Sequence, residues 1–290
     1  MNNTNHNRIK VADLETNQPN KTLATNEKGE LEFIAISDNT LDPVSATTPG
    51  IVDNTSLQEL GGADKTINEI RIGKGNSNIE NNTALGYLTL TNNTTGNYNT
   101  SVGSKSMHIN TTGIRNTAVG TYSMYNNITG TRNTTLGSTS LYSNIDGSHN
   151  IAVGSQALFS NTSGSGNTAI GTDTLAKNII GQYNTAVGYR ASYYCTNGQH
   201  NVAVGNTSLG SNTGQGNTAI GAGAGSRINS NFNIAVGYNA FGENPIANAP
   251  VTGEYNIIMG FQAGRDLTTG SRNILIENTT NASITSGSNN

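Results

Sequence analysis

A repeat of about 17 residues fills the chain from about residue 78 onward, and it restricts the possible folds more than any other feature. Lines such as NYNTSVGSKSMHINTTG, IRNTAVGTYSMYNNITG and TRNTTLGSTSLYSNIDG stack in one register. Each block of the type Asn-Thr-Ala-Val-Gly ends on a glycine, and the successive glycines are spaced by seven intervals of 17, two of 16 and one of 23 residues. An asparagine stands four residues before each glycine, and a twelfth in-phase asparagine, Asn273, opens a last block that ends on Glu277. Twelve blocks in phase predict one structural unit per period.

A period near 17 is too short for helical-hairpin repeats, which need more than about 30 residues, and it fits one coil of a β-solenoid. The residue before each glycine is always apolar and the one before that is usually Ala, which predicts a short buried strand. A second apolar position lies four residues after the glycine, for example at Leu90, Met107 and Leu141. We therefore expect two short strands and two turns in each coil, with about 12 coils in all.

Stacked identical coils pair their backbone groups at roughly 4.8 Å, so 12 coils would span roughly 58 Å. Asparagine and glycine suit this arrangement because Gly adopts φ > 0 in turns and Asn tolerates it. The chain holds 46 Asn, 39 Thr and 35 Gly. We expect in-phase residues to form a structural ladder along the stack; its members include Asn116, Asn133, Asn150, Asn167 and Asn184 and also Gly120, Gly137, Gly154, Gly171 and Gly188.

One coil encloses little apolar volume. Hydrophobic residues make up 33% of the chain, whereas ordering costs about 1–2 kcal/mol per residue. Two apolar residues and an Ala per 17 do not offset that cost. We therefore predict that several chains share an axial core, with their Thr-Ala-Val strands facing one another.

Charge separates a first region from the repeats. Residues 1–75 hold 7 basic and 11 acidic residues, and the segment 31–36 alternates as a strand does. We expect residues 1–75 to form short strands and linkers that attach the chain to a larger assembly, residues 76–277 to form the solenoid, and residues 278–290 to form a C-terminal tail.

The repeats resemble the head domains of trimeric autotransporter adhesins, the YadA-like heads, through the AsnThrAlaValGly blocks at 116–120 and 184–188 and the AsnThrAlaIleGly blocks at 167–171 and 217–221. The longer coil with its Asn-Thr-Thr-Gly turns is similar to that of bacteriophage fibres. The segments KTLATNEKGELEFIAI and SATTPGIVDNTSLQELGG resemble N-terminal parts of tail fibres. The resemblance implies an all-β, left-handed β-roll in a homotrimer.

The resemblance also implies a virion tail fibre, made in the host cytoplasm, that docks on tail or capsid proteins through residues 1–75 and mediates adsorption to the host cell. No apolar segment long enough for a signal peptide or membrane span is present in the sequence. The net charge of −3 argues against a nucleic-acid partner. The single Cys195 and four scattered His give no metal spacing, and no acid pair or nucleophile-base arrangement recurs. We expect no catalytic residues, no cofactor and no metal.

Two surface features are candidate contacts for a host glycan or protein. Aromatic residues in phase, five positions after the glycine, predict a ridge of rings; they are Tyr125, Tyr142, Phe159 and Tyr193. The 23-residue interval predicts a protruding loop around Asn244, Pro245 and Pro250. For each feature a structural role, as a packing ridge or a coil-closing spacer, stays open.

Two other functions are compatible with the sequence. The chain can be a structural spacer or decoration of the particle that touches no receptor. It can also be an ice-binding solenoid, because Thr recurs in phase at positions such as Thr83, Thr100 and Thr117, although Ile or Val takes that place in other coils.

Overall fold

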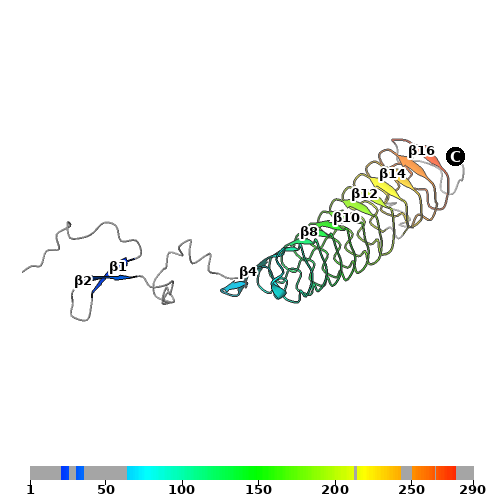
Figure 1. The fold of residues 1–290 in the computed structure, drawn as a ribbon. Helices are drawn as coiled ribbons and strands as arrows, with labels where there is room; N and C mark the ends of the chain where they lie inside the picture. Colours follow the sequence, from blue (N-terminus) through cyan, green and yellow to red (C-terminus); the bar gives the residue numbers. More distant parts are fainter. Residues whose placement is uncertain are drawn as a thin grey trace, which may run out of the picture. The chain divides into compact units, whose positions relative to one another are not determined.

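The structure is a computed structural model that describes residues 21–25, 31–35, 64–211, 214–242, 250–264 and 266–278. The chain divides into two compact units, Met1–Glu59 and Leu60–Asn290. In the first unit, β1 (Lys21–Thr25) and β2 (Leu31–Ala35) pair as an antiparallel sheet. The second unit contains the repeats and forms a parallel β-solenoid (Figure 1).

The solenoid consists of about eleven turns with a period near 17 residues. Twelve parallel strands, one from each repeat, lie side by side in chain order in one sheet. The count is one turn lower than the expected 12 because twelve strands in sequence enclose eleven complete turns between them. The strands are β5 (Thr83–Gly86), β6 (Thr100–Val102), β7 (Thr117–Val119), β8 (Thr134–Leu136), β9 (Ile151–Val153), β10 (Thr168–Ile170), β11 (Thr185–Val187), β12 (Val202–Val204), β13 (Thr218–Ile220), β14 (Ile234–Val236), β15 (Ile257–Met259) and β16 (Ile274–Ile276).

The strands pair without any shift in register. For example, Thr168 lies beside Thr185 and Ala169 lies beside Ala186. Equivalent repeat positions are therefore nearest neighbours along the stack, including across the two 16-residue coils and the 23-residue interval. Each repeat position becomes a row that runs along the solenoid.

The prediction of a second strand in each coil is wrong. The apolar residue four positions after the glycine is in a turn with a left-handed backbone, as at Met107 (φ 47°), Leu141 (φ 50°) and Leu158 (φ 53°). These residues still bond to the adjacent coil, since the Leu141 N–H donates to the Ala157 carbonyl at 2.8 Å. Hydrogen bonds between coils thus satisfy the backbone N–H and C=O groups of this turn, although it is not a strand. The large side chain of the turn can therefore point into the core.

The core is a narrow column inside the coils. It contains the middle residue of each strand, such as Ala118 and Ala152, and the large residue of the following turn, such as Met124 and Leu158, all fully buried. The core is thin, as predicted, but the apolar residue before each glycine, which was expected to be enclosed, lies outside it: Leu136 is 52% exposed. Polar side chains occupy much of the remaining interior, including two in-phase rows of buried Asn.

The first buried row starts at Asn82 and includes the expected ladder asparagines. Each accepts a hydrogen bond from the backbone of the next coil, as when the Asn133 N–H donates to Asn116 Oδ1 at 2.9 Å. Each also donates to a glycine carbonyl of that coil, as when Asn116 Nδ2 donates to the Gly130 carbonyl at 2.8 Å. These bonds join neighbouring coils inside the core.

A second row, which the sequence analysis did not predict, links side chain to side chain. Asn127 Nδ2 donates to Asn110 Oδ1 at 2.7 Å, and Asn144 Nδ2 donates to Asn127 Oδ1 at 2.8 Å. The row contains Asn93, Asn110, Asn127, Asn144, Asn161 and Asn178. Each member from Asn110 onward therefore fixes the distance between its own coil and the one before.

The coil glycines stand where the chain turns out of the strand, with φ between 126° and 145°. A Cβ atom built on Gly137 would lie 2.5 Å from the carbonyl oxygen of Gly154 in the next coil. Both the dihedral angle and the close approach of two backbones require glycine there.

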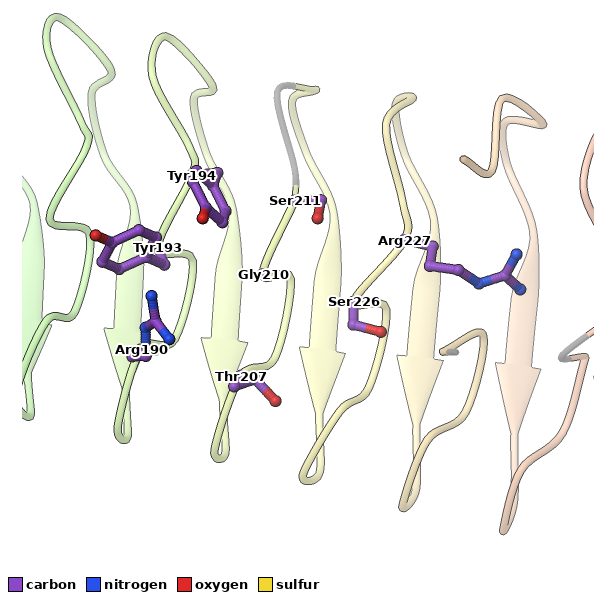
Figure 2. A pocket seen from close by; sticks show the side chains of 8 residues that line it. All are labelled: Arg190, Tyr193, Tyr194, Thr207, Gly210, Ser211, Ser226 and Arg227. Atoms are coloured by element: carbon purple, nitrogen blue, oxygen red, sulfur yellow. The ribbon is translucent and has the colours of Figure 1, made fainter. Parts of the chain in front are cut away.

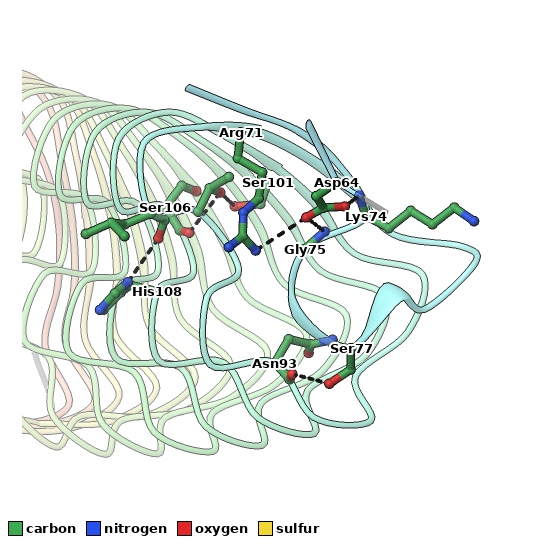
Figure 3. Close-up of polar contacts among 11 residues, drawn as sticks. Asp64, Arg71, Lys74, Gly75, Ser77, Asn93, Ser101, Ser106 and His108 are labelled. Atoms are coloured by element: carbon green, nitrogen blue, oxygen red, sulfur yellow. Dashed lines mark hydrogen bonds and ion pairs between the residues drawn. The ribbon is translucent and has the colours of Figure 1, made fainter. Parts of the chain in front are cut away.

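An antiparallel hairpin covers the first coil. β3 (Lys65–Ile67) pairs with β4 (Ile70–Gly73), and β4 pairs with β5. The Asp64 carboxylate accepts hydrogen bonds from the N–H groups of Lys74, at 2.5 Å, and Gly75, at 2.8 Å, and it lies 3.4 Å from the Arg71 guanidinium (Figure 3). The hairpin therefore occupies the edge that a bare first strand would expose. Its residues 65–73 belong to the solenoid sheet, although the charge boundary grouped them with residues 1–75.

The 23-residue interval keeps its flanking coils in contact. Asn244 and Pro245 of the expected loop are outside the described residues, while Pro250 is exposed. The next residue, Val251, is fully buried and bridges to Ile228. The coil thus closes again directly after Pro250.

Candidate binding surfaces

The outer face that strands β5–β16 form is a strip that the described residues leave uncovered. Side chains alternate along each strand, so the middle residue points into the core and its two neighbours point outward. None of the outward residues in β5–β16 is buried. Leu136, Ile170 and Ile220 in one of the two rows are 52%, 41% and 43% exposed.

The two outward rows are chemically different. The row that ends the strands is apolar throughout, and the row that begins them contains Thr in some strands and branched aliphatic residues such as Ile151 and Val202 in others. A continuous apolar row along twelve coils is unusual for a surface that stays in water, because large exposed apolar patches mark interaction sites. The face is a candidate docking surface.

The in-phase aromatic residues form a ring stack over four coils. Tyr125 and Tyr142 stack at 5.3 Å between ring centroids, and Tyr142 and Phe159 stack at 5.2 Å. His108, which the sequence analysis did not assign to the ridge, extends it by stacking on Tyr125 at 5.2 Å. Ala176 interrupts the row, so Tyr193 stands apart from these rings.

Stacking limits what the ridge can bind. Aromatic rings recognise sugars through their faces, and each inner ring of the stack has a neighbouring ring over both faces. Tyr125 and Tyr142 therefore present mainly their edges to solvent. An open ring face is expected only where the row is broken, as it is around Tyr193.

The side chains five positions before each glycine form another exposed row, and neighbouring members of this row contact each other. Tyr183 stacks on His200 at 5.2 Å and Phe232 stacks on Tyr255 at 5.1 Å, whereas Arg132 contacts His149 at 3.2 Å. His149 and His200 lie in different pairs. The part of the chain that the structure describes contains no group of three or more His, Cys, Asp or Glu that could hold a metal ion.

A pocket of about 260 Å³ lies between successive coils after the break in the ridge (Figure 2). None of its lining residues belongs to a strand, so it is separate from the outer sheet face. The lining residues are Arg190, Tyr193, Tyr194, Thr207, Gly210, Ser211, Ser226 and Arg227.

Of these, the sequence analysis identified only Tyr193. The available signal was the repeat itself, because Gly210 and Ser226 occupy the ridge position in the two coils that have only 16 residues. Small residues at a position that holds rings elsewhere indicate a gap in the surface.

Cys195 ends the second asparagine row. It stands one period after Asn178, and the Oδ1 atom of Asn178 is buried without a hydrogen-bond partner because Cys195 supplies no amide there. Burial raises the pKa of the Cys195 thiol to about 11. Hydrogen bonds with Gly198 and Ser192 lower this pKa, but their effect is smaller than that of burial. The thiol is therefore a protonated core group at neutral pH.

Among the described residues, no helix is long and apolar enough to cross a membrane. A scan against protein-family models finds no matching family, and searches of curated proteins and of solved structures also find no match. The chain is thus described by its architecture, which is that of a β-solenoid repeat protein.

Proposed function

We propose that the chain is the subunit of a trimeric virion fibre that projects from a phage particle and mediates adsorption to the host cell surface. The observation that carries the proposal is the outer sheet face, whose apolar row continues over all twelve parallel strands and is not covered by any other described part of the chain. Three copies that turn this face toward one axis would bury it. The same arrangement supplies the apolar contact that the narrow core of one chain lacks.

The resemblance to YadA-like heads and to phage fibres supports the same proposal, since it rests on the strand blocks that build this face. In this proposal the winding is left-handed and residues 1–75 dock on tail or capsid proteins. The exposed rings of the repeated coils would provide many weak contacts to host glycans or proteins. Three chains would multiply those contacts by valency.

Virions that carry a chain deleted for residues 78–290 test the function. A fibre that contacts the receptor should lose adsorption to host cells in the deletion, and added purified full-length chain should compete with wild-type virions for the same cells. Unchanged adsorption, with the truncated chain present on the particle, would make the repeats a spacer or decoration.

Ice binding is a second candidate because of one feature of the sheet. Thr83, Thr100, Thr117 and Thr134 are adjacent in four successive strands and are not buried. The row then changes to Ile151, which weakens the match to a regular lattice. Thermal hysteresis measured on the purified chain decides this: a freezing-point gap supports ice binding, and its absence eliminates it.

A further inference from the structure

After Tyr193 the ridge position holds no ring in the next three coils, where it is Gly210, Ser226 and Gly242, and the pocket of about 260 Å³ lies beside the first two of these residues. Gly210 and Ser226 occupy the position that holds Tyr142 or Phe159 in other coils. A water molecule takes about 30 Å³ of liquid, so the pocket has room for roughly nine waters. That space suits one sugar ring and is too small for an oligosaccharide chain.

One wall of the pocket is aromatic. Tyr193 and Tyr194 meet edge to face with 4.6 Å between ring centroids, and Tyr194 is 55% exposed. Neither has a stacked ring above it, because the next coil holds Gly210 and Ser211 at the equivalent positions (Figure 2). The Arg190 guanidinium lies over the Tyr193 ring, so the apolar C–H face of a pyranose can pack on the Tyr194 side of this wall, which the continuous stack of Tyr125 and Tyr142 does not allow.

The charge of the lining is positive. It includes Arg190 and Arg227 and contains no Asp or Glu. The Arg190 guanidinium lies 4.4 Å from the Tyr193 ring centroid. The ion pair among the described residues joins Arg71 to Asp64 at the first coil and does not involve Arg190. Asp173 is near Arg190 but lies one coil back and does not line the pocket. Arg190 contacts the Tyr193 side chain, but no ion pair among the described residues uses its charge, so a carboxylate can bind it beside that ring.

Hydroxyl groups complete the lining. Thr207 and Ser211 each contribute one, whereas the Oγ atom of the third hydroxyl residue of the lining, Ser226, is buried beneath the surface without a hydrogen-bond partner in the structure. Arg227 is buried and its Nε donates to the Gly242 carbonyl, which fixes the end of the pocket opposite Tyr193. A buried hydroxyl with no partner costs free energy unless a ligand or water satisfies it.

From these contacts we propose that the pocket binds a single pyranose that carries a carboxylate, such as a uronic acid unit of a surface polysaccharide. Arg190 binds the carboxylate, the exposed Tyr194 ring packs on the sugar ring, and the Thr207 and Ser211 hydroxyls bond to sugar hydroxyls. The biological use of the site rests on the proposed adhesive function, whereas the binding itself is a property of the purified chain.

The test is saturation-transfer and titration NMR of the full-length protein with glucuronate and galacturonate, beside glucose and galactose at equal concentrations. Wild-type protein should bind the acids with a preference of about tenfold over the neutral sugars, because a charge-assisted hydrogen bond is about twice as strong as a neutral one. Arg190→Gln should remove that preference. Lys105→Gln is the matched control, since Lys105 stands at the same repeat position and also lies over a tyrosine ring, Tyr122, but lines no part of the pocket.

Gly210→Phe closes the gap by continuing the ridge. A Cβ atom on Gly210 would lie 3.2 Å from the Thr207 carbonyl oxygen, a tight contact, and would meet no other atom, so the backbone leaves room for a side chain to start there. This variant should lose binding of both acids and neutral sugars while its thermal melt stays near that of wild type. If it fails to fold, Arg190→Gln and Lys105→Gln still decide the matter.

Equal binding of acidic and neutral sugars, no binding at all, or binding that survives both Arg190→Gln and a folded Gly210→Phe would overturn the proposal. The fibre function fails separately, if adsorption persists without residues 78–290. A pocket that binds uronic acids in a protein that does not adsorb would leave the site in place and remove only its proposed use.

Discussion

Buried asparagine amides hold neighbouring coils together across the core. Asn144 shows this most fully, since its Nδ2 donates to Asn127 Oδ1 and to the Gly147 carbonyl, both at 2.8 Å, and its Oδ1 accepts from Asn161. A narrow column offers few apolar contacts, so these satisfied polar groups specify how one coil sits on the next.

Asn144→Ala should therefore cost roughly 3 kcal/mol of unfolding free energy, because it leaves buried groups on two adjacent coils without partners. Urea denaturation followed by circular dichroism measures the loss. Asn126→Ala is the control: its side chain is only half-buried, and the change should stay within about 0.5 kcal/mol. Equal effects of the two substitutions would contradict a structural role for the second asparagine row.

Cys195 predicts a stability change at high pH. In the unfolded chain the thiol has its ordinary pKa of 9.0, and in the folded chain burial raises the pKa to about 11. Below pH 9 both states hold the proton, so the contribution is fully present there. Between pH 9 and pH 11 only the unfolded state loses the proton, and stability falls by ~2 kcal/mol over that window.

Comparison with Cys195→Ala isolates this effect from the tyrosines, which ionise in the same range. The difference in unfolding free energy between wild type and Cys195→Ala should shift by ~2 kcal/mol toward the variant from pH 8.5 to pH 11. A constant difference would show that the thiol is not buried as described.

The single coil derives its shape from its glycines. Gly137 combines φ of 145° with a contact to the backbone of the next coil. Gly137→Ala should destabilise the protein by ~3 kcal/mol or more, since both strain and overlap with fixed backbone oppose the methyl group. Gly210→Ala has neither problem and should change stability by less than about 1 kcal/mol. Thermal melts of the two variants side by side make the comparison, and a tolerated Gly137→Ala would argue against backbone contact between the coils.

The coil was largely predictable because identical residues in phase require identical conformations. The Asn-to-Gly spacing therefore located the twelve parallel strands, and it placed Ala118 and its equivalents in the core. The second strand could not be excluded from sequence, because Met107 and Leu141 are apolar and such residues seldom adopt φ > 0. Only the stacking of complete coils shows that their backbone bonds are met in that conformation.

The candidate sites were less predictable for a related reason. The phase of Tyr125, Tyr142 and Phe159 predicted a ridge, but the covering of ring faces depends on ring orientation. The pocket spans three coils and exists because Gly210 and Ser226 carry no ring at the ridge position. The β3–β4 hairpin has no repeat signal, and its place on the first coil follows from the Asp64 contacts.

The outer sheet face is the surface through which several chains would assemble. Ile170→Lys together with Val187→Lys places two charges in the middle of the apolar row. In a trimer closed over this face the charges would be buried without partners, so the assembly should dissociate or fail to form. Gln156→Lys is the control, because this position is exposed and holds Lys105 in another coil. Size-exclusion chromatography with light scattering distinguishes the variants; unchanged mass in the double variant would place the contact elsewhere.

The mass of the full-length chain in solution tests the central claim most directly. Sedimentation equilibrium at micromolar concentration should give three times the chain mass of 30.2 kDa, with no folded single chain at detectable amounts. A stable, folded species of 30.2 kDa would show that one thin solenoid stands by itself, and the fibre built on a shared core would have to be abandoned.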